Sequence, residues 1–196
     1  MSPTHTAHQL PSRAAVVGAG AWGTTFASLL AEAGAPTTVW ARRQEVAAEI
    51  NSGTNTRYAP GLSLPPEVRA TTDMRAAVAG VGIVVVALPS QLARGAIEPL
   101  AGAVEPGALV VSLMKGIELG TRMRMSEVLA QVLEVPGERV AVVSGPNLAD
   151  EIAVRQPTAT VVASSSQDTA AAVAAACATA TFRPYTNTDV LGVELC

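Results

Sequence analysis

The sequence predicts an α/β fold, a doubly wound and mostly parallel sheet with helices on both faces. Three observations indicate this class. Short, bounded apolar runs alternate along the chain with segments of helical composition, which is the pattern of repeated strand–helix–strand units. The run Ile83–Leu88 is apolar at every position, as in a strand that is buried on both faces. Apolar residues make up 49% of the 196 positions and aromatic residues only 3%, which favours a helix-covered sheet over an all-β sandwich.

The first half of the chain is predicted to alternate strands and helices from residue 14 onward. The expected strands are Ala14–Val17, Thr37–Trp40, Ala70–Thr72 and Ile83–Leu88, and the expected helices are Gly23–Ala33, Gln44–Asn51, Met74–Ala79 and one that starts at Gln91. Gly34 takes the C-cap position of the first helix, and Asp73 takes the N-cap position of the third. Gly53–Pro66 holds three prolines and two glycines without periodicity, which predicts a surface loop.

The second half of the chain continues the alternation. The expected strands are Leu109–Ser112, Val140–Val143, Thr158–Ala163 and Thr181–Tyr185, and the expected helices are Thr121–Glu134, Leu148–Val154 and Asp168–Ala178. Near the end, Thr188 is expected to be an N-cap, Asp189 favours a first helical turn, and Val190–Cys196 has the composition of a helix just begun. A domain is not expected to stop at that point, so the sequence predicts a chain that is cut short.

Composition and charge exclude several classes of function. The net charge of −3 and the scattered basic residues leave no electrostatic footprint for nucleic acid. No apolar stretch reaches transmembrane length, and residues 1–12 lack the apolar core of a signal peptide, which predicts a disordered leader. Cys177 and Cys196 lack metal-ligand spacing, and His5 and His8 lie in the leader. We therefore expect no metal site and a cytoplasmic protein.

The strongest motif is Gly-x-Gly-x-x-Gly at residues 18–23, directly after the first apolar run. A strand, a tight turn and a helix N-terminus in this order seat the pyrophosphate of a dinucleotide. Gly18 permits the turn, Gly20 lets the backbone approach the phosphates, and Gly23 lets the helix pack closely on the strand. The sequence therefore predicts a Rossmann-like dinucleotide-binding domain.

Two arginines indicate which dinucleotide is preferred. Arg42 and Arg43 follow the second strand, where a site for NAD normally places an acidic residue that binds the ribose 2′-hydroxyl. Guanidinium groups suit a 2′-phosphate instead, although arginines in such a connection are also common as solvated surface residues. We expect NADP(H) as the preferred cofactor, with NAD(H) as the alternative.

Three further loops follow apolar strands and are expected to meet at the same edge of the sheet. They begin at Pro89, Lys115 and Gly145, and each alone is typical of an ordinary turn. Lys115 is the one lysine beside twelve arginines, which favours a role for a compact ammonium group, such as polarising a carbonyl or holding a phosphate. The amide of Asn147 is suited to orienting a carbonyl or hydroxyl group.

Other reactive side chains are expected to be structural or solvated. Glu118 and Glu151 have no partner carboxylate at a recognisable spacing, so we expect both to face solvent. Cys177 lies in an alanine-rich segment, and we expect it to be part of the core.

Six motifs in order carry a family resemblance. They are Gly-Ala-Gly-Ala-Trp-Gly (18–23), Val-Trp-Ala-Arg-Arg (39–43), Arg-Tyr-Ala-Pro-Gly (57–61), Leu-Met-Lys-Gly-Ile-Glu (113–118), Val-Ser-Gly-Pro-Asn-Leu-Ala (143–149) and Gly-Val-Glu-Leu (192–195). Over residues 13–196 the chain resembles the N-terminal domain of bacterial NAD(P)-dependent sn-glycerol-3-phosphate dehydrogenases. This family interconverts dihydroxyacetone phosphate and sn-glycerol 3-phosphate, a precursor of phospholipids.

The resemblance implies roles for individual residues. The implied cofactor-binding residues are Gly18, Gly20, Ala21, Trp22, Gly23, Arg42, Arg43, Tyr58, Lys115 and Ala149, and the implied substrate-binding residues are Lys115, Gly145 and Asn147. The family motif usually has leucine where this chain has Ala59, a small departure in a loop.

The resemblance also implies what lies beyond the sequence. In the family, the Gly-Val-Glu-Leu motif continues into a helix with the proton-acceptor lysine, which would stand just after Cys196. A helical domain with the phosphate-binding arginine and asparagine follows. The implied division is a leader at 1–12, a Rossmann-like domain at 13–187 and a truncated start of the helical substrate domain at 188–196. The chain would then hold no catalytic residue and be inactive alone, and the full-length form could be a homodimer.

Two alternative functions stay open at this point. One is a non-catalytic fragment or module that binds NADPH, which the early end of the sequence suggests. The other is a related β-hydroxyacid dehydrogenase, which the Lys-Gly-Ile-Glu and Ser-Gly-Pro-Asn segments disfavour.

Overall fold

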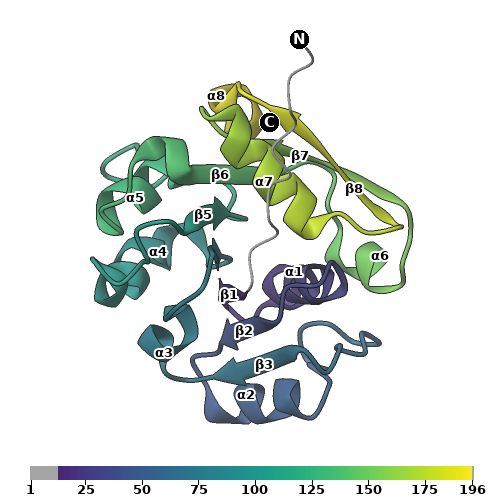
Figure 1. The fold of residues 1–196 in the computed structure, drawn as a ribbon. Coiled ribbons are helices and arrows are strands. Elements are labelled where there is room, and N and C mark those ends of the chain that lie inside the picture. The colour runs from purple at the N-terminus through teal and green to yellow at the C-terminus, as the bar shows by residue number, and fades with distance from the viewer. Residues whose placement is uncertain (1–12, 196) are drawn as a thin grey trace.

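The computed structural model describes residues 13–195, so the predicted leader, with its two histidines, and Cys196 lie outside the described residues. The chain forms one eight-stranded sheet in the order β3-β2-β1-β4-β5-β6-β7-β8, with helices on both faces (Figure 1). The predicted doubly wound, mostly parallel α/β fold is confirmed. In the part of the chain that the structure describes, no helix has the length and hydropathy needed to cross a membrane.

The strands are β1 Ala14–Val17, β2 Thr37–Trp40, β3 Val68–Thr71, β4 Ile83–Val86, β5 Leu109–Ser112, β6 Val140–Ser144, β7 Thr158–Ala163 and β8 Phe182–Asn187. Strands β1 to β6 pair in parallel, β7 pairs with β6 antiparallel, and β8 runs parallel to β7. The chain order reverses between β1 and β4, which both pair with neighbours on either side. In sheets of this kind, ligands bind outside the carboxyl ends of the strands at that reversal.

The helices are α1 Ala21–Glu32, α2 Gln44–Asn51, α3 Met74–Val78, α4 Ser90–Ile97, α5 Met125–Val132, α6 Ala149–Ala153, α7 Gln167–Cys177 and α8 Val190–Leu195, with short 3-10 turns at Glu98–Leu100 and Gly137–Arg139. Helices α1 and α7 cover one face of the sheet, and α3, α4 and α5 cover the other (Figure 1).

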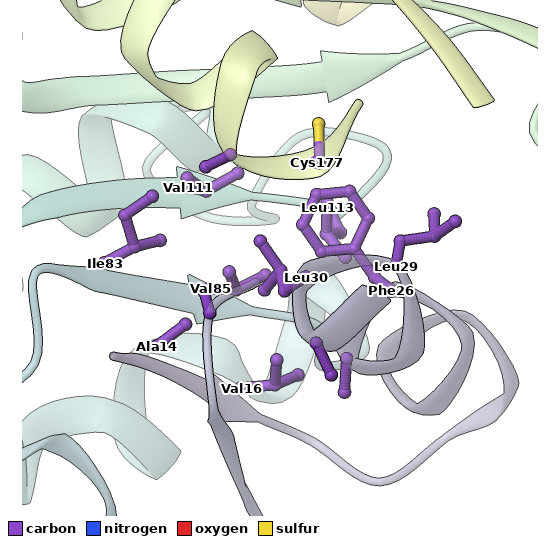
Figure 2. Packing of buried hydrophobic residues seen from close by; sticks show 14 of the residues in the cluster. Ala14, Val16, Phe26, Leu29, Leu30, Ile83, Val85, Val111, Leu113 and Cys177 are labelled. Atoms are coloured by element: carbon purple, nitrogen blue, oxygen red, sulfur yellow. The ribbon is translucent and has the colours of Figure 1, made fainter. Parts of the chain in front are cut away.

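The core consists of two apolar layers, one on each face of the sheet. Figure 2 shows part of the first layer, which includes Phe26 and Leu30 of α1 and Val16 of β1. On the opposite face, Val17 of the same strand packs with Ile97 of α4. All five of these side chains are at most 1% exposed, and burying each contributes about 1.5–3 kcal/mol. Because successive strand residues alternate between the layers, the strands read as continuous apolar runs.

The largest error in the predicted elements concerns the helix expected at Thr121–Glu134. The helix α5 spans only Met125–Val132. Arg122 and Glu134 have positive φ angles of 60° and 55°, so the backbone leaves the right-handed helical region on both sides of α5. The residues that flank α5 keep the apolar spacing of a helix, so the sequence pattern extends beyond the helix that forms.

The start of α8 also differs from the prediction. The N-cap is Asp189 and not Thr188, because the Asp189 carboxylate accepts a hydrogen bond from the Gly192 amide at 2.9 Å. Glu194 of this helix is buried and accepts hydrogen bonds from the amide and hydroxyl of Ser126, at 2.7 and 2.6 Å. These contacts attach α8 to the first turn of α5.

Candidate functional site

The glycine motif forms a tight turn between β1 and α1. Gly18 has a φ of 125°, and a Cβ atom placed there would collide with the backbone oxygen of Ala87 at the end of β4. A Cβ atom at Gly23 would collide with the Gly18 oxygen. These two glycines are therefore required by the fold, as predicted.

Gly20 differs from the other two glycines of the motif. It has a φ of −74°, and no heavy atom of the described residues lies within 4 Å of the Cβ that it lacks. It is the N-cap residue of α1, and among residues 13–195 no side chain caps that helix. The positive end of the α1 dipole is therefore open to an anion.

The glycine turn is supported by a residue that the sequence analysis did not select. Asn55 is 1% exposed and donates hydrogen bonds to the Ala19 carbonyl at 3.1 Å and to the Thr24 hydroxyl at 2.7 Å. Its loop was predicted to lie on the surface, but Asn55, Ala59 and Leu64 are buried. The predicted surface loop is confirmed for the segment, most of which is exposed or half-buried, but these three residues pack inward, and nothing in the local composition indicates that.

One cleft lies on the β2 side of the turn. It has a volume of about 500 Å³ and is lined by Gly18, Ala19, Gly20, Trp40, Ala41, Arg42, Arg43, Val46, Tyr58, Ala87, Leu88, Pro89, Leu92 and Ala96. The Arg43 guanidinium donates a hydrogen bond to the Tyr58 hydroxyl at 3.0 Å. The guanidinium carbon of Arg57 lies over the same ring, 5.4 Å from its centroid. Two arginines therefore lie beside Tyr58 at this end of the cleft. Arg43 also pairs there with the Glu45 carboxylate at 3.3 Å, and Arg42 is exposed in the lining.

A second cleft lies on the β5 side of the turn. It has a volume of about 460 Å³ and is lined by Gly20, Trp22, Gly23, Ala87, Leu88, Pro89, Ser90, Gln91, Leu113, Met114 and Lys115. The two clefts share Gly20, Ala87, Leu88 and Pro89. They therefore form one elongated depression that crosses the N-terminus of α1 at the reversal of strand order.

The loops after β5 and β6 meet, as expected from the sequence. The Lys115 ammonium donates a hydrogen bond to the Gly145 carbonyl at 3.3 Å. The backbone amide of Asn147 donates to the same oxygen at 2.8 Å. The Asn147 side chain donates to Thr160 at 2.9 Å. Its Oδ1 is buried and has no hydrogen-bond partner among the described residues. The two loops thus bring an ammonium group close to a buried acceptor oxygen that has no partner among the described residues.

Some residues expected at the site lie farther from the clefts. Ala149 is the first residue of α6, a helix that packs on α1. Gly145 and Asn147 line neither of the two clefts. They are connected to the second cleft by the hydrogen bond between Lys115 and the Gly145 carbonyl.

The prediction that Glu118 faces solvent was wrong. Glu118 is buried, and its two carboxylate oxygens accept hydrogen bonds from Nε and Nη2 of Arg94, each at 2.9 Å. Hydrogen bonds from Arg94 and then from Thr121 lower the pKa of the Glu118 carboxyl below its ordinary value. The partner lies 24 residues earlier, so no local spacing in the sequence indicates the pair. Glu151 is exposed, as predicted.

Within the described residues, neither Cys177 nor the acidic side chains form a further candidate site. Cys177 is buried in the core as predicted, and burial raises the pKa of its thiol to about 12, which makes it a poor nucleophile. Within residues 13–195, no three His, Cys, Asp or Glu side chains gather as a metal site.

Comparisons with known proteins agree with this geometry. The family model described as NAD-dependent glycerol-3-phosphate dehydrogenase N-terminus matches residues 13–170. Proteins curated as glycerol-3-phosphate dehydrogenase of the NAD(P)+ type are similar to it. The one from Streptomyces griseus is 54% identical over 186 residues, which are 94% of this chain and 55% of the relative. The one from Thermobifida fusca is 52% identical with the same coverage. The chain therefore spans about half the length of these relatives.

A solved structure shows the same fold. The glycerol-3-phosphate dehydrogenase from Coxiella burnetii superposes with a TM-score of 0.85 at 31% identity, over 93% of this chain and 56% of that chain.

Proposed function

Because this chain belongs to the family of NAD-dependent glycerol-3-phosphate dehydrogenases, matching its N-terminal part, we propose that it binds the nicotinamide cofactor of such an enzyme. The reaction is the interconversion of dihydroxyacetone phosphate and sn-glycerol 3-phosphate. The observation that supports this most directly is the continuous depression from Arg42, Arg43 and Tyr58 across the α1 N-terminus to Lys115. Its length and its cationic end suit an extended dinucleotide.

The residues present fit a phosphorylated dinucleotide. The uncapped N-terminus of α1 and the open space at Gly20 leave room for a pyrophosphate, in the described part of the chain. Arg42 and Arg43 supply charge at the end of β2, where NAD sites place a carboxylate. We therefore assign cofactor binding to Gly18, Gly20, Ala21, Trp22, Gly23, Arg42, Arg43, Tyr58, Lys115 and Ala149, with NADP(H) preferred over NAD(H).

Lys115, Gly145 and Asn147 form the proposed substrate side of the site. When bound, the nicotinamide supplies or accepts the hydride. The Lys115 ammonium would stabilise negative charge on a ketone oxygen or a phosphate, because a fixed cation acts strongly where water is excluded. The buried Oδ1 of Asn147, which has no partner among the described residues, would accept a hydrogen bond from a substrate hydroxyl that reaches it. We assign the proton acceptor to a group outside these 196 residues. It would belong to the part of the relatives that this sequence does not cover.

The remaining parts of the proposal come from the sequence. They are a cytoplasmic location, a role in supplying glycerol phosphate for lipid synthesis, and a homodimer in the full-length form. No metal is needed for the proposed chemistry, because Lys115 supplies the charge.

Tryptophan fluorescence tests the cofactor assignment. Trp40 lines the first cleft and Trp22 the second, so bound NADPH is expected to quench emission in a saturable way. We expect NADPH to bind at least about tenfold more tightly than NADH, and Arg42→Gln to narrow that ratio. An Arg69→Gln variant, on the outer strand β3, serves as the control for a general loss of charge.

Two results would overturn the proposal at different levels. Absence of saturable quenching would remove the dinucleotide assignment. Turnover of dihydroxyacetone phosphate by the 196-residue chain at rates typical of dehydrogenases, about 1–10³ s⁻¹, would show that the proton acceptor lies inside it. Cofactor binding without turnover, even after the coding sequence is extended, would favour a non-catalytic module.

A further inference from the structure

The segment that carries Lys115 is a tight loop between β5 and α5. Residues 113–124, here called the Lys115 loop, fold back so that Ile117 forms an antiparallel bridge with Arg124. The Glu118 amide donates to the Met123 carbonyl at 2.9 Å. The loop therefore has a defined shape of its own, with Lys115 at its β5 end and residues 117–119 on one side.

The side chain of Gln91, in the first turn of α4, holds the backbone of this loop at two points. Its Nε2 donates to the Ile117 carbonyl at 2.8 Å, and its Oε1 accepts from the Leu119 amide at 2.9 Å. One amide group thus binds the backbone on both sides of Glu118. Such a two-point contact fixes the position of the loop along α4 as well as its distance from it.

The side chain of Arg94 holds the residue between these two points. Its guanidinium makes two parallel hydrogen bonds to the Glu118 carboxylate, each at 2.9 Å. The same group lies 3.6 Å from the Met123 sulfur, on the returning side of the loop. Gln91 and Arg94 are three residues apart on one helix and so share a face. We call these two side chains the α4 clamp.

The clamp connects the loop to the wall of the proposed cofactor site. Ser90 and Gln91 at the start of α4 line the same cleft as Lys115. Gly116 has a φ of 97°, and a Cβ placed on it would lie 3.7 Å from the Ser90 hydroxyl. The loop therefore passes close to the first turn of α4 before it reaches the clamp.

We propose that Gln91 and Arg94 are positioning residues that place the Lys115 ammonium in the cofactor and substrate cleft. The inference rests on the proposed function, because Lys115 is taken there as the cationic group of the site. A purely architectural role explains the contacts less well. Helix α4 is anchored in the core by Ala93 and Ile97, both fully buried, and these lie outside the clamp.

The one lysine of the chain makes the test specific. Reductive methylation with ¹³C-formaldehyde labels Lys115 and the terminal amine and keeps the charge, so one side-chain NMR signal reports on this ammonium. The test variant is Arg94→Gln. The matched control is Arg155→Gln, since Arg155 makes an equivalent two-point pair with Glu32 on another part of the surface, at 3.1 and 3.0 Å.

Two measurements are compared, the shift of the Lys115 signal at NADPH concentrations that saturate tryptophan quenching and amide exchange without NADPH. In the wild-type chain and in Arg155→Gln, NADPH is expected to shift the Lys115 signal. In Arg94→Gln that shift should fall below about half, and amide exchange in residues 117–123 should accelerate at least about threefold, the factor expected from losing a partly exposed ion pair. Arg94→Lys, which keeps the charge without the two-point geometry, should give intermediate values.

The proposal is overturned if Arg94→Gln matches the wild-type chain in both measurements, or if Arg155→Gln changes them equally. If Arg94→Gln lowers the folded fraction seen by circular dichroism, the same two measurements on Arg94→Lys are used instead. A result equal to that of the wild-type chain in both then overturns the proposal. Failure of the proposed function is seen separately, as absence of saturable quenching in the wild-type chain. The exchange measurement needs no NADPH and would still test whether Arg94 orders the loop.

Discussion

Alanine substitutions in the glycine motif should separate the requirements of folding from those of binding. Gly18 and Gly20 are two residues apart, yet their surroundings differ. Gly18→Ala would place a methyl group against the Ala87 oxygen in a backbone conformation with a φ of 125°. Gly20→Ala would place it in space that no described residue occupies within 4 Å, with an ordinary φ of −74°.

The expected cost to folding follows from these differences. An unfavourable φ costs a non-glycine residue about 1–3 kcal/mol. Overpacking against a neighbour adds about 1–3 kcal/mol, and Ala87 has little freedom to move because its amide donates to the Val17 carbonyl at 2.9 Å. Gly18→Ala should therefore lower the free energy of unfolding by about 2–6 kcal/mol, a large share of a typical total of about 5–15 kcal/mol. Gly20→Ala should lower it by less than about 1 kcal/mol, the usual difference between these residues at an N-cap.

The expected cost to binding has the opposite order. A methyl group at Gly20 would stand where the proposed pyrophosphate approaches the helix. An overpacking cost of about 1–3 kcal/mol corresponds to a dissociation constant for NADPH raised about 5- to 150-fold.

Thermal unfolding and NADPH titration measure the two effects in the same samples. In a domain of this size, each kcal/mol lowers the Tm by about 2–4 °C, so Gly18→Ala should lose about 4–24 °C while Gly20→Ala loses at most about 4 °C. The reasoning would be refuted if Gly20→Ala unfolded as early as Gly18→Ala. It would also be refuted if Gly20→Ala bound NADPH as tightly as the wild-type chain does.

Three further predictions concern buried polar contacts. Arg94 lowers the pKa of Glu118 below its ordinary value of 4.5, so the carboxylate stabilises the fold above about pH 4.5 and this contribution is lost as the pH falls through the lowered pKa. Lowering the pH from 5 to 3 should therefore reduce the free energy of unfolding, measured with urea, less in Glu118→Gln than in the wild-type chain. Equal losses in the two proteins would contradict the stabilising role of the Glu118 carboxylate. Glu194→Ala leaves the amide and hydroxyl of Ser126 without their acceptor and should cost about 1–3 kcal/mol in urea unfolding; an unchanged midpoint would show that α8 is not anchored there. Asn55→Ala removes both side-chain hydrogen bonds that support the glycine turn and should weaken NADPH binding in the fluorescence titration. Asn51→Ala removes two hydrogen bonds to the Ala70 backbone of β3 instead and should leave NADPH binding unchanged.

The parts of the fold that the sequence predicts well are those encoded by neighbouring residues. The apolar run Ala14–Val17 is followed at once by Gly18, which takes a positive φ, and by Gly23, whose close contact is with Gly18 itself. Asp73 lies directly before α3 and caps it as expected. In such cases backbone geometry and residue type determine the outcome without reference to the rest of the chain.

The parts that it does not predict depend on partners far along the sequence. Glu118 looks solvated in its own segment, and its burial follows from Arg94 on a different element. Asn55 belongs to a loop rich in turn residues, and only the packing of that loop on α1 shows that its amide supports the glycine turn. The meeting of Lys115 with Gly145 was predictable, because parallel strands share one carboxyl edge. The roles of both residues in binding stay predictions.

Because β7 runs antiparallel to β6, a different part of this strand lies beside the proposed site at the carboxyl ends of β1–β6. Val161 of β7 pairs with Ser144 at the carboxyl end of β6, so it is the beginning of β7 that arrives at this edge. Thr160 is consequently able to accept a hydrogen bond from Asn147 and donate one to the Ser144 carbonyl. Strand polarity therefore extends the set of positions that border the proposed site. Because β7 and β8 both run opposite to β1–β6, that set includes residues from the first half of a reversed strand.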